Sequence, residues 1–135
     1  MGAPIQRRVL IVDDNQDSAV SLGKMLEMLG YETCTACDGA AALEAASGFR
    51  PDVAILDIGM PEMNGYELGR RIREQAWGKG TLLIALTGWG QAADKQRTTE
   101  AGFGHHLVKP VQFDVLTRLL ASVPSSRDGM SPGQA

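Results

Sequence analysis

The stretch VAILDIGMPEMNG, residues 53–65, decides the fold of this chain. Its first four residues form an apolar run that is typical of a buried strand, and the run ends on a carboxylate, Asp57. A turn follows at once, with a glycine, a proline and an Asn-Gly pair. A single acidic residue in such a place is usually a helix cap or a solvated loop residue. The meaning of Asp57 therefore depends on which residues end the other strands.

Apolar runs and helical patterns alternate five times along the chain. The apolar runs predict strands over residues 8–12, 31–36, 52–56, 81–86 and 106–108. A helix is predicted after each strand. The first carries Ala19, Leu22, Leu26 and Leu29 on one side and ends at Gly30; the last carries Leu116, Leu119, Leu120 and Val123. The three between them are 39–47, which is closed by Gly48, then 66–75, and the polar segment 90–102. All the strands except 31–36 are almost wholly apolar, which is expected when helices cover both faces of a parallel sheet. The fold class is therefore α/β, an open five-stranded sheet.

Length and composition describe one ordinary globular domain. The chain has 135 residues, of which 44% are hydrophobic and 21% are charged. A formal net charge of -3 and the lack of a lysine- and arginine-rich run argue against a nucleic-acid partner. No apolar stretch approaches the ~20 residues that cross a membrane, and the first residues contain no apolar signal core. We therefore expect a cytoplasmic location and no membrane span in this chain.

The alternation of strands and helices also sets the expected domain boundaries. Residues 1–6 are an N-terminal extension, 7–123 form the domain, and 124–135 have no pattern and are expected to be a disordered tail or linker stub. No internal repeat appears beyond the alternation itself. The sequence leaves the oligomeric state open.

Reactive polar residues stand at the carboxyl ends of four predicted strands. Asp13 and Asp14 follow the first strand, Asp57 the third, Thr87 the fourth and Lys109 the fifth. Ligands of open parallel sheets bind beyond the carboxyl ends of the strands, and neighbouring strands lie roughly 4.8 Å apart. If these four strands are neighbours, three carboxylates, a hydroxyl and an ammonium group converge on one small site.

Such a cluster calls for a cation. Three carboxylates close together repel one another, and Lys109 supplies only one positive charge. Mg²⁺ is the natural further cation, because it binds through oxygen to few protein carboxylates and keeps several of its waters. A metal ion, a lysine and a hydroxyl around one carboxylate also form a phosphoryl-binding site, in which the carboxylate can act as the nucleophile.

Four stretches of the chain resemble the signatures of the response-regulator receiver domain of two-component signalling. They are IVDDN at 11–15, LDIGMPEMNG at 56–65, ALTGWG at 85–90 and HLVKP at 106–110. The resemblance covers about residues 7 to 122, in register and in order. It implies the flavodoxin-like, doubly wound (βα)5 fold with strand order 2-1-3-4-5.

The resemblance also implies a role for each residue at the phosphoryl group. Asp57 would be the phosphoacceptor, taking the group from a phosphohistidine on a histidine kinase or a histidine phosphotransfer protein. Thr87 would donate a hydrogen bond to the bound group, and Lys109 would form an ion pair with it. The Lys109–Pro110 bond would be cis. The chain would then be a signalling receiver that catalyses only its own phosphorylation and slow dephosphorylation.

The metal ligands follow from the resemblance in the same way. Asp14 would bind Mg²⁺ directly and Asp13 mostly through water. Asp57 would be a further carboxylate ligand, and Gly59 would offer its carbonyl oxygen.

Two residues depart from the family pattern. The family usually has tyrosine or phenylalanine three residues before the lysine, and His106 stands there; Trp89 stands two residues after Thr87, where small or polar residues are frequent. Both departures concern the switch that follows phosphorylation. The stretches around them resemble receivers of hybrid sensor histidine kinases more than those of DNA-binding regulators, and a stand-alone receiver is the alternative.

Three other functions are weighed against this interpretation. GWGQAA at 88–93 fits a dinucleotide-binding pattern. It falls in the fourth strand–helix unit, however, which is too late in the chain to start a βαβ unit with an acidic residue at its second strand. An α/β phosphoryl-transfer enzyme or phosphatase with an aspartyl nucleophile needs a second aspartate two residues after the first, where Gly59 stands. Cys34 and Cys37 form a C-x-x-C pair, which indicates packing rather than redox chemistry and supplies only two of four zinc ligands.

Overall fold

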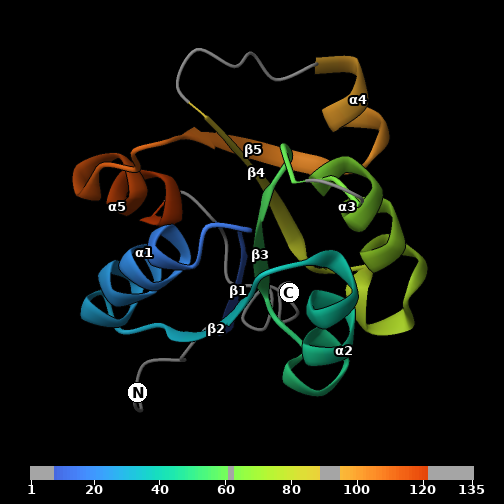
Figure 1. Ribbon diagram of the computed structural model, residues 1–135, viewed down its shortest axis with the longest axis horizontal. Helices are drawn as coiled ribbons and strands as arrows, with labels where there is room; N and C mark the ends of the chain where they lie inside the picture. The colour runs from blue at the N-terminus through green and yellow to red at the C-terminus, as the bar shows by residue number, and fades with distance from the viewer. Residues whose placement is uncertain (1–7, 61–62, 89–94, 122–135) are drawn as a thin grey trace, which may run out of the picture.

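A computed structural model describes residues 8–60, 63–88 and 95–121 of the chain. Figure 1 shows one sheet with helices on both of its faces. The strands are β1 (Arg8–Val12), β2 (Glu32–Ala36), β3 (Val53–Asp57), β4 (Leu82–Thr87) and β5 (Phe103–Val108). The helices are α1 (Gln16–Met28), α2 (Gly39–Phe49), α3 (Gly65–Glu74), α4 (Lys95–Glu100) and α5 (Phe113–Ala121), with a 3₁₀ turn, η1 (Ala76–Gly78), before β4.

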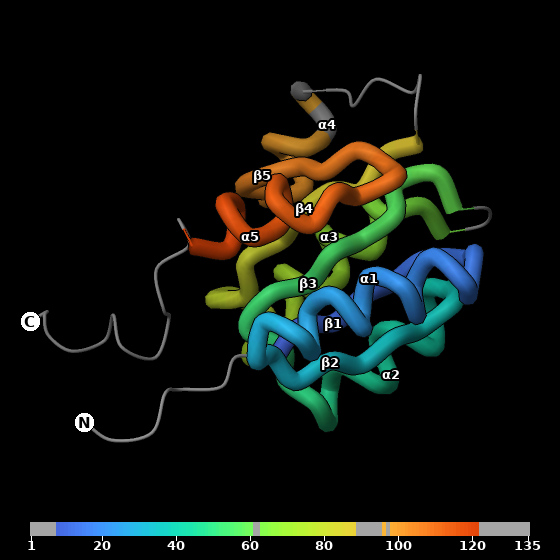
Figure 2. The backbone as a smooth tube through the Cα atoms, turned by 90° about the vertical axis from the view of Figure 1, so that its left-hand side faces the viewer, coloured from blue at the N-terminus to red at the C-terminus, as the bar shows by residue number. Residues whose placement is uncertain are grey.

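The sheet has the order β2-β1-β3-β4-β5, and every described pair of strands is parallel. The predicted α/β class and strand order are therefore confirmed. Helices α1 and α5 cover one face, while α2 and α3 cover the other (Figures 1 and 2). The alternation of side chains along β1 explains why both faces are apolar: Val9 and Ile11 pack with α1 and α5, whereas Leu10 and Val12 pack with α2 and α3.

Side-chain caps start three of the helices. Asn15, Asp38 and Asn64 each accept a hydrogen bond from the backbone N–H three residues on, at donor–acceptor distances of 3.0, 2.8 and 3.0 Å. These caps satisfy amide groups that have no partner inside the helix. The connection from Val12 to the cap Asn15 is short, whereas that from Asp57 to the cap Asn64 is longer.

The helix ends and the last strand differ in part from the predictions. Gly30 lies after α1 with φ of 96°, as expected for a stop, but Gly48 lies inside α2. Arg50 takes the left-handed conformation there instead, with φ of 52°. The segment predicted as a helix over 90–102 is helical over Lys95–Glu100, and residues 89–94 lie outside the described part of the chain.

Strand β5 begins three residues earlier than predicted and contains a bulge. Phe103 pairs with Leu83 and His105 pairs with Ile84, so Gly104 has no partner across the sheet. Leu107 is buried against α5, whereas Val108 at the end of the strand is 44% exposed. β5 is an edge strand of the sheet.

No helix in the described ranges combines the length and the apolar character needed to cross a membrane. The expected tail, 124–135, and the expected extension, 1–6, lie outside the described residues.

Candidate functional site

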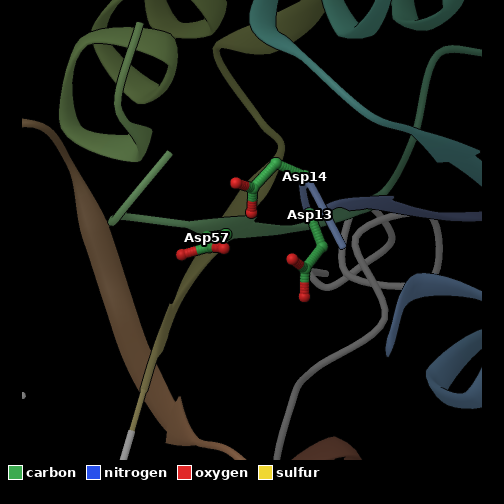
Figure 3. Close-up of side chains that lie close together, drawn as sticks. All are labelled: Asp13, Asp14 and Asp57. Atoms are coloured by element: carbon green, nitrogen blue, oxygen red, sulfur yellow. The ribbon is translucent and has the colours of Figure 1, made fainter. Parts of the chain in front are cut away.

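The predicted convergence of polar residues is found at the carboxyl edge of the sheet. Asp13 and Asp14 come directly after β1, Asp57 is the last residue of β3, and Lys109 comes directly after β5. Each of the three carboxylates offers an oxygen within 4.8 Å of the other two. Figure 3 shows the three side chains close together at the ends of β1 and β3.

The three carboxylates differ in their exposure and in what holds them. Asp13 is fully buried, Asp57 is 5% exposed, and Asp14 is exposed. The backbone N–H of Asn15 donates to Asp13 Oδ1 over 2.9 Å, and that of Gly59 donates to Asp57 Oδ1 over 2.8 Å. Because each bond comes from two residues further along the chain, the turn itself sets the orientation of the carboxylate.

Lys109 connects the two buried carboxylates. Its Nζ lies 3.2 Å from Asp13 Oδ1 and 3.3 Å from Asp57 Oδ2. Burial lowers the pKa of Lys109, but the hydrogen bond to Asp13 and the negative charge of Asp57 outweigh burial, and the pKa lies above its ordinary value. Lys109 is therefore a fixed positive charge at neutral pH. The bond from Lys109 to Pro110 is cis, as predicted.

Asp13 Oδ2 is a buried carboxylate oxygen that accepts no hydrogen bond and could therefore bind a cation. Asp13 Oδ2 lies 3.0 Å from Lys109 Nζ, an ion-pair distance, yet the angle is unsuitable for a hydrogen bond and this buried atom has no hydrogen-bond partner. Three carboxylates against one ammonium group also leave two negative charges without compensation. A buried carboxylate oxygen that accepts no hydrogen bond is costly, and the two remaining negative charges repel each other, so the cluster fits a hard divalent ion such as Mg²⁺.

Thr87 has the predicted position but a different partner. It is the last residue of β4 and is 1% exposed, and its hydroxyl donates to the backbone carbonyl of Leu107 over 3.3 Å. The hydroxyl is thus bonded to β5. His106 lies beside Ala85 in the register of β4 and β5 and is exposed, while Trp89 lies outside the described residues.

A recess beside the site was not predicted from the sequence. It has a volume of about 310 Å³ and lies between α1 and the segment after β5; its lining includes Asn15, Ser18, Ser21, Lys109 and Pro110. The serines look like ordinary helix residues in the sequence. Only the pairing of β5 beside β4 brings the segment after β5 close to the start of α1.

A second residue that the sequence analysis missed is Gly65. A Cβ atom at this position would lie 2.7 Å from the backbone oxygen of Asp57 and 2.8 Å from the Cα atom of Ile58. The absence of a side chain lets the start of α3 rest against the end of β3. The Asn-Gly pair was the signal for this close approach, and it was interpreted only as a turn.

The two cysteines do not form a reactive pair. Both are free; Cys34 is partly buried in β2, and burial raises the pKa of its thiol. A raised thiol pKa lowers the fraction of reactive thiolate. Within the described ranges, the three aspartates are the group of acidic, histidine or cysteine residues that could hold a metal ion.

The parallel sheet and its carboxyl-edge cluster of aspartates, threonine and lysine define a class of phosphoryl-accepting switch domains. The sequence model of the response regulator receiver domain matches residues 9–121, and the chain belongs to this family. It is a module of two-component and phosphorelay signalling rather than a catalytic enzyme.

Relatives with known names divide into two kinds. The chain is 39% identical over 113 residues to the sensor histidine kinase RcsC of Salmonella typhimurium, covering 84% of this chain and 12% of that protein. It is 39% identical over 116 residues to the transcriptional regulatory protein PrrA of Mycobacterium bovis, covering 86% of this chain and 48% of that protein. The chain therefore spans about half or much less of the length of these relatives.

Solved structures agree with the fold. The chemotaxis protein CheY4 of Vibrio cholerae superimposes with a TM-score of 0.82 at 34% identity, over 89% of this chain and all of that one. The receiver domain of the sensor histidine kinase PA1611 from Pseudomonas aeruginosa gives a TM-score of 0.75 at 32% identity, over 86% of this chain and 95% of that one. That structure holds a magnesium ion in its active-site cleft. The aspartate triad found here is typical of such a site.

Proposed function

We propose that Asp57 accepts a phosphoryl group from a phosphohistidine of a histidine kinase or a histidine phosphotransfer protein. An Asp57 oxygen forms the new P–O bond while the P–N bond of the donor breaks and the donor imidazole takes back the electron pair. The observation that carries the proposal is the placement of this carboxylate: it is 5% exposed and lies 3.3 Å from the Lys109 ammonium. A neighbouring cation keeps the carboxylate ionised and also attracts the incoming phosphoryl oxygens.

The remaining site residues have supporting roles in this proposal. Asp13, Asp14 and Asp57, with the carbonyl of Gly59, would hold Mg²⁺. When bound, this ion neutralises charge on the phosphoryl oxygens during transfer. Lys109 would pair with one phosphoryl oxygen, and the Thr87 hydroxyl would turn from the Leu107 carbonyl to another. Asp13 Oδ2, which is buried and accepts no hydrogen bond, supports the metal assignment. The long bond of 3.3 Å from the Thr87 hydroxyl to the Leu107 carbonyl supports the last step.

The partner and its place of approach are part of the same proposal. The recess between α1 and Pro110 lies beside Lys109 and offers room for a side chain of the phosphodonor. Asp57 itself is 5% exposed and Asp14 is exposed, so the donor histidine would enter from the side of Asp14. Residues 7–123 would form the whole receiver domain, and family membership supports a cytoplasmic location.

The test is phosphorylation by a small phosphodonor, acetyl phosphate, followed by the intact mass of the protein. The wild type should gain one phosphoryl group in the presence of Mg²⁺ and none in excess chelator. Asp57→Asn should gain none under either condition. Asp114→Asn, which removes an exposed carboxylate of α5 that does not line the recess, is the matched control and should behave as the wild type. A stable mass gain on Asp57→Asn, or labelling that chelator leaves undiminished, would show that the assignment is wrong.

A further inference from the structure

A second hollow lies at the opposite edge of the sheet from the aspartates. It has a volume of about 310 Å³ and is lined by Arg8 at the start of β1 and by residues of the segments that precede β3 and β4. Arg8 begins β1 and Asp13 follows it, so the two edges are about 16 Å apart along the strand. This hollow, which we name the distal hollow, is separate from the phosphoryl site.

Two guanidinium groups stand at the distal hollow without an acidic partner among the described ion pairs. Arg8 Nε donates to the Arg50 carbonyl over 3.4 Å, and Arg50 Nε donates to the Ser47 carbonyl over 3.4 Å. Both bonds are long, and each guanidinium carries four more N–H donors. The Arg8 guanidinium also lies 6.0 Å from the centre of the Phe49 ring, which holds it in place. The two groups are therefore positioned and still able to bind an anion.

The one carboxylate of the lining does not cancel this charge. Asp52 Oδ2 accepts a hydrogen bond from the backbone N–H of Arg8 over 2.9 Å. Two arginines against one aspartate leave one net positive charge in the lining. Guanidinium groups match the planar, two-oxygen face of a carboxylate or phosphate group.

The rest of the lining suits a flat ring. Trp77 lines the hollow, is partly buried and packs against the core cluster on the α2–α3 face of the sheet. Thr81 is buried, and its hydroxyl donates to the Pro51 carbonyl over 3.0 Å, so this donor is already used. The volume corresponds to a small molecule and lies at the lower end of the range for ligand sites.

We propose that the distal hollow binds a small organic anion that carries a flat aromatic ring, such as a nucleoside monophosphate or an aryl carboxylate. The ring stacks on Trp77, and the anionic group accepts hydrogen bonds from Arg8 and Arg50. Both ligand kinds share this chemistry, and neither needs the phosphoryl site. Stacking on an indole and pairing with guanidinium groups are each favourable alone, and together they require a ligand that has both parts.

Gly80 offers a way to block the hollow without changing its charge. A Cβ atom at Gly80 would meet no atom within 4 Å, so a larger side chain can enter the open space without strain. Gly80→Leu should therefore fold normally and fill the hollow. Arg50→Asn removes one guanidinium and keeps a residue that tolerates the left-handed conformation found there.

The experiment is a titration of Trp77 fluorescence in a Trp89→Phe background, in which Trp77 is the remaining one of the two tryptophans. The probes are AMP, benzoate, adenosine and inorganic phosphate. At least one of AMP and benzoate should saturate the signal, and which of them binds more tightly identifies the ligand kind. Adenosine, which lacks the anion, and phosphate, which lacks the ring, should bind at least about tenfold more weakly, because each loses one of the two interactions.

The variants separate this site from other binding. Arg50→Asn should weaken binding by about tenfold, as expected for a lost charge-assisted hydrogen bond, and Gly80→Leu should abolish it. Arg118→Gln, which removes an exposed guanidinium of α5, should bind like the background protein. Asp57→Asn should also leave binding unchanged, which keeps this test independent of phosphorylation. The proposal is overturned if neither AMP nor benzoate saturates below about 10 mM, or if binding persists unchanged in Arg50→Asn and Gly80→Leu.

Discussion

Replacing Lys109 by methionine should destabilise the protein mainly through the carboxylates it leaves behind. Methionine keeps the apolar stem of the side chain but removes the ammonium group, which lies 3.0 Å from Asp13 Oδ2 and 3.3 Å from Asp57 Oδ2. At an effective dielectric constant of about 20, each contact has a Coulomb energy of about 5 kcal/mol before the opposing cost of desolvation. Breaking a buried ion pair costs roughly 3–5 kcal/mol in measured cases. Because the Lys109 side chain is 26% exposed, we expect the lower end, about 3 kcal/mol.

Mg²⁺ should reverse most of this loss. The ion is a second source of positive charge for the same carboxylates, and it stabilises the folded state only to the extent that it binds there. The difference in unfolding free energy between wild type and Lys109→Met should therefore fall to about 1 kcal/mol or less in saturating Mg²⁺.

The assay is urea unfolding followed by circular dichroism, with chelator and with Mg²⁺. A loss of about 3 kcal/mol corresponds to a midpoint lower by roughly 1–3 M urea at an unchanged slope. Lys24→Met, at an exposed position of α1, is the control for a lost lysine charge. Its unfolding free energy should stay within about 0.5 kcal/mol of that of the wild type. If Lys109→Met matches the wild type in chelator, or if Mg²⁺ stabilises both proteins equally, the reasoning about unpaired carboxylates is refuted.

Three further predictions concern stability and geometry. The raised pKa of Lys109 stabilises the folded protein fully below the ordinary lysine pKa of about 10.4, and this contribution is lost as pH rises through the folded-state value. In urea unfolding, the difference in unfolding free energy between the wild type and Lys109→Met should therefore shrink above about pH 10.4. Gly65→Ala should push the end of β3 and slow acetyl phosphate labelling by about tenfold or more, whereas Gly48→Ala, where a Cβ meets nothing within 4 Å, should label normally. Arg73→Met should lower the unfolding free energy by about 2–4 kcal/mol, because its guanidinium donates to the carbonyls of Gly78, Thr81 and Gly102; equal thermal midpoints would contradict this.

The site could be predicted because strand ends are visible in a sequence. An apolar run that stops at a charged residue marks both the strand and its last position, and the parallel order then brings Asp13, Asp57 and Lys109 to one edge. The orientation of Thr87 could not be predicted in this way. Its hydroxyl can serve several acceptors, and only the position of β5 shows that the Leu107 carbonyl is the one it uses.

The parts that sequence analysis missed depend on contacts between distant segments. Arg73 looks like one of several arginines on an exposed helix, yet it donates to carbonyls in η1, in the segment before β4 and in the segment before β5. The end of α2 was placed at Gly48 because glycine commonly stops helices, whereas the chain turns at Arg50 instead. The start of β5 has no apolar run and forms a strand because the edge of β4 is available for pairing.

The bulge at Gly104 separates two tasks of the last strand. Side chains alternate between the two faces of a sheet, so Phe103 and His105 would share a face in a regular strand. Because Gly104 is unpaired, Phe103 lies beside Leu83 and His105 lies beside Ile84, two neighbours on β4 whose side chains pack in different clusters. Phe103 can therefore contact Tyr66 of α3, while residues 105–108 keep a regular register with β4 that leads to Lys109 and the aspartates. One glycine thus lets the start of the strand serve the hydrophobic packing and its end serve the phosphoryl site.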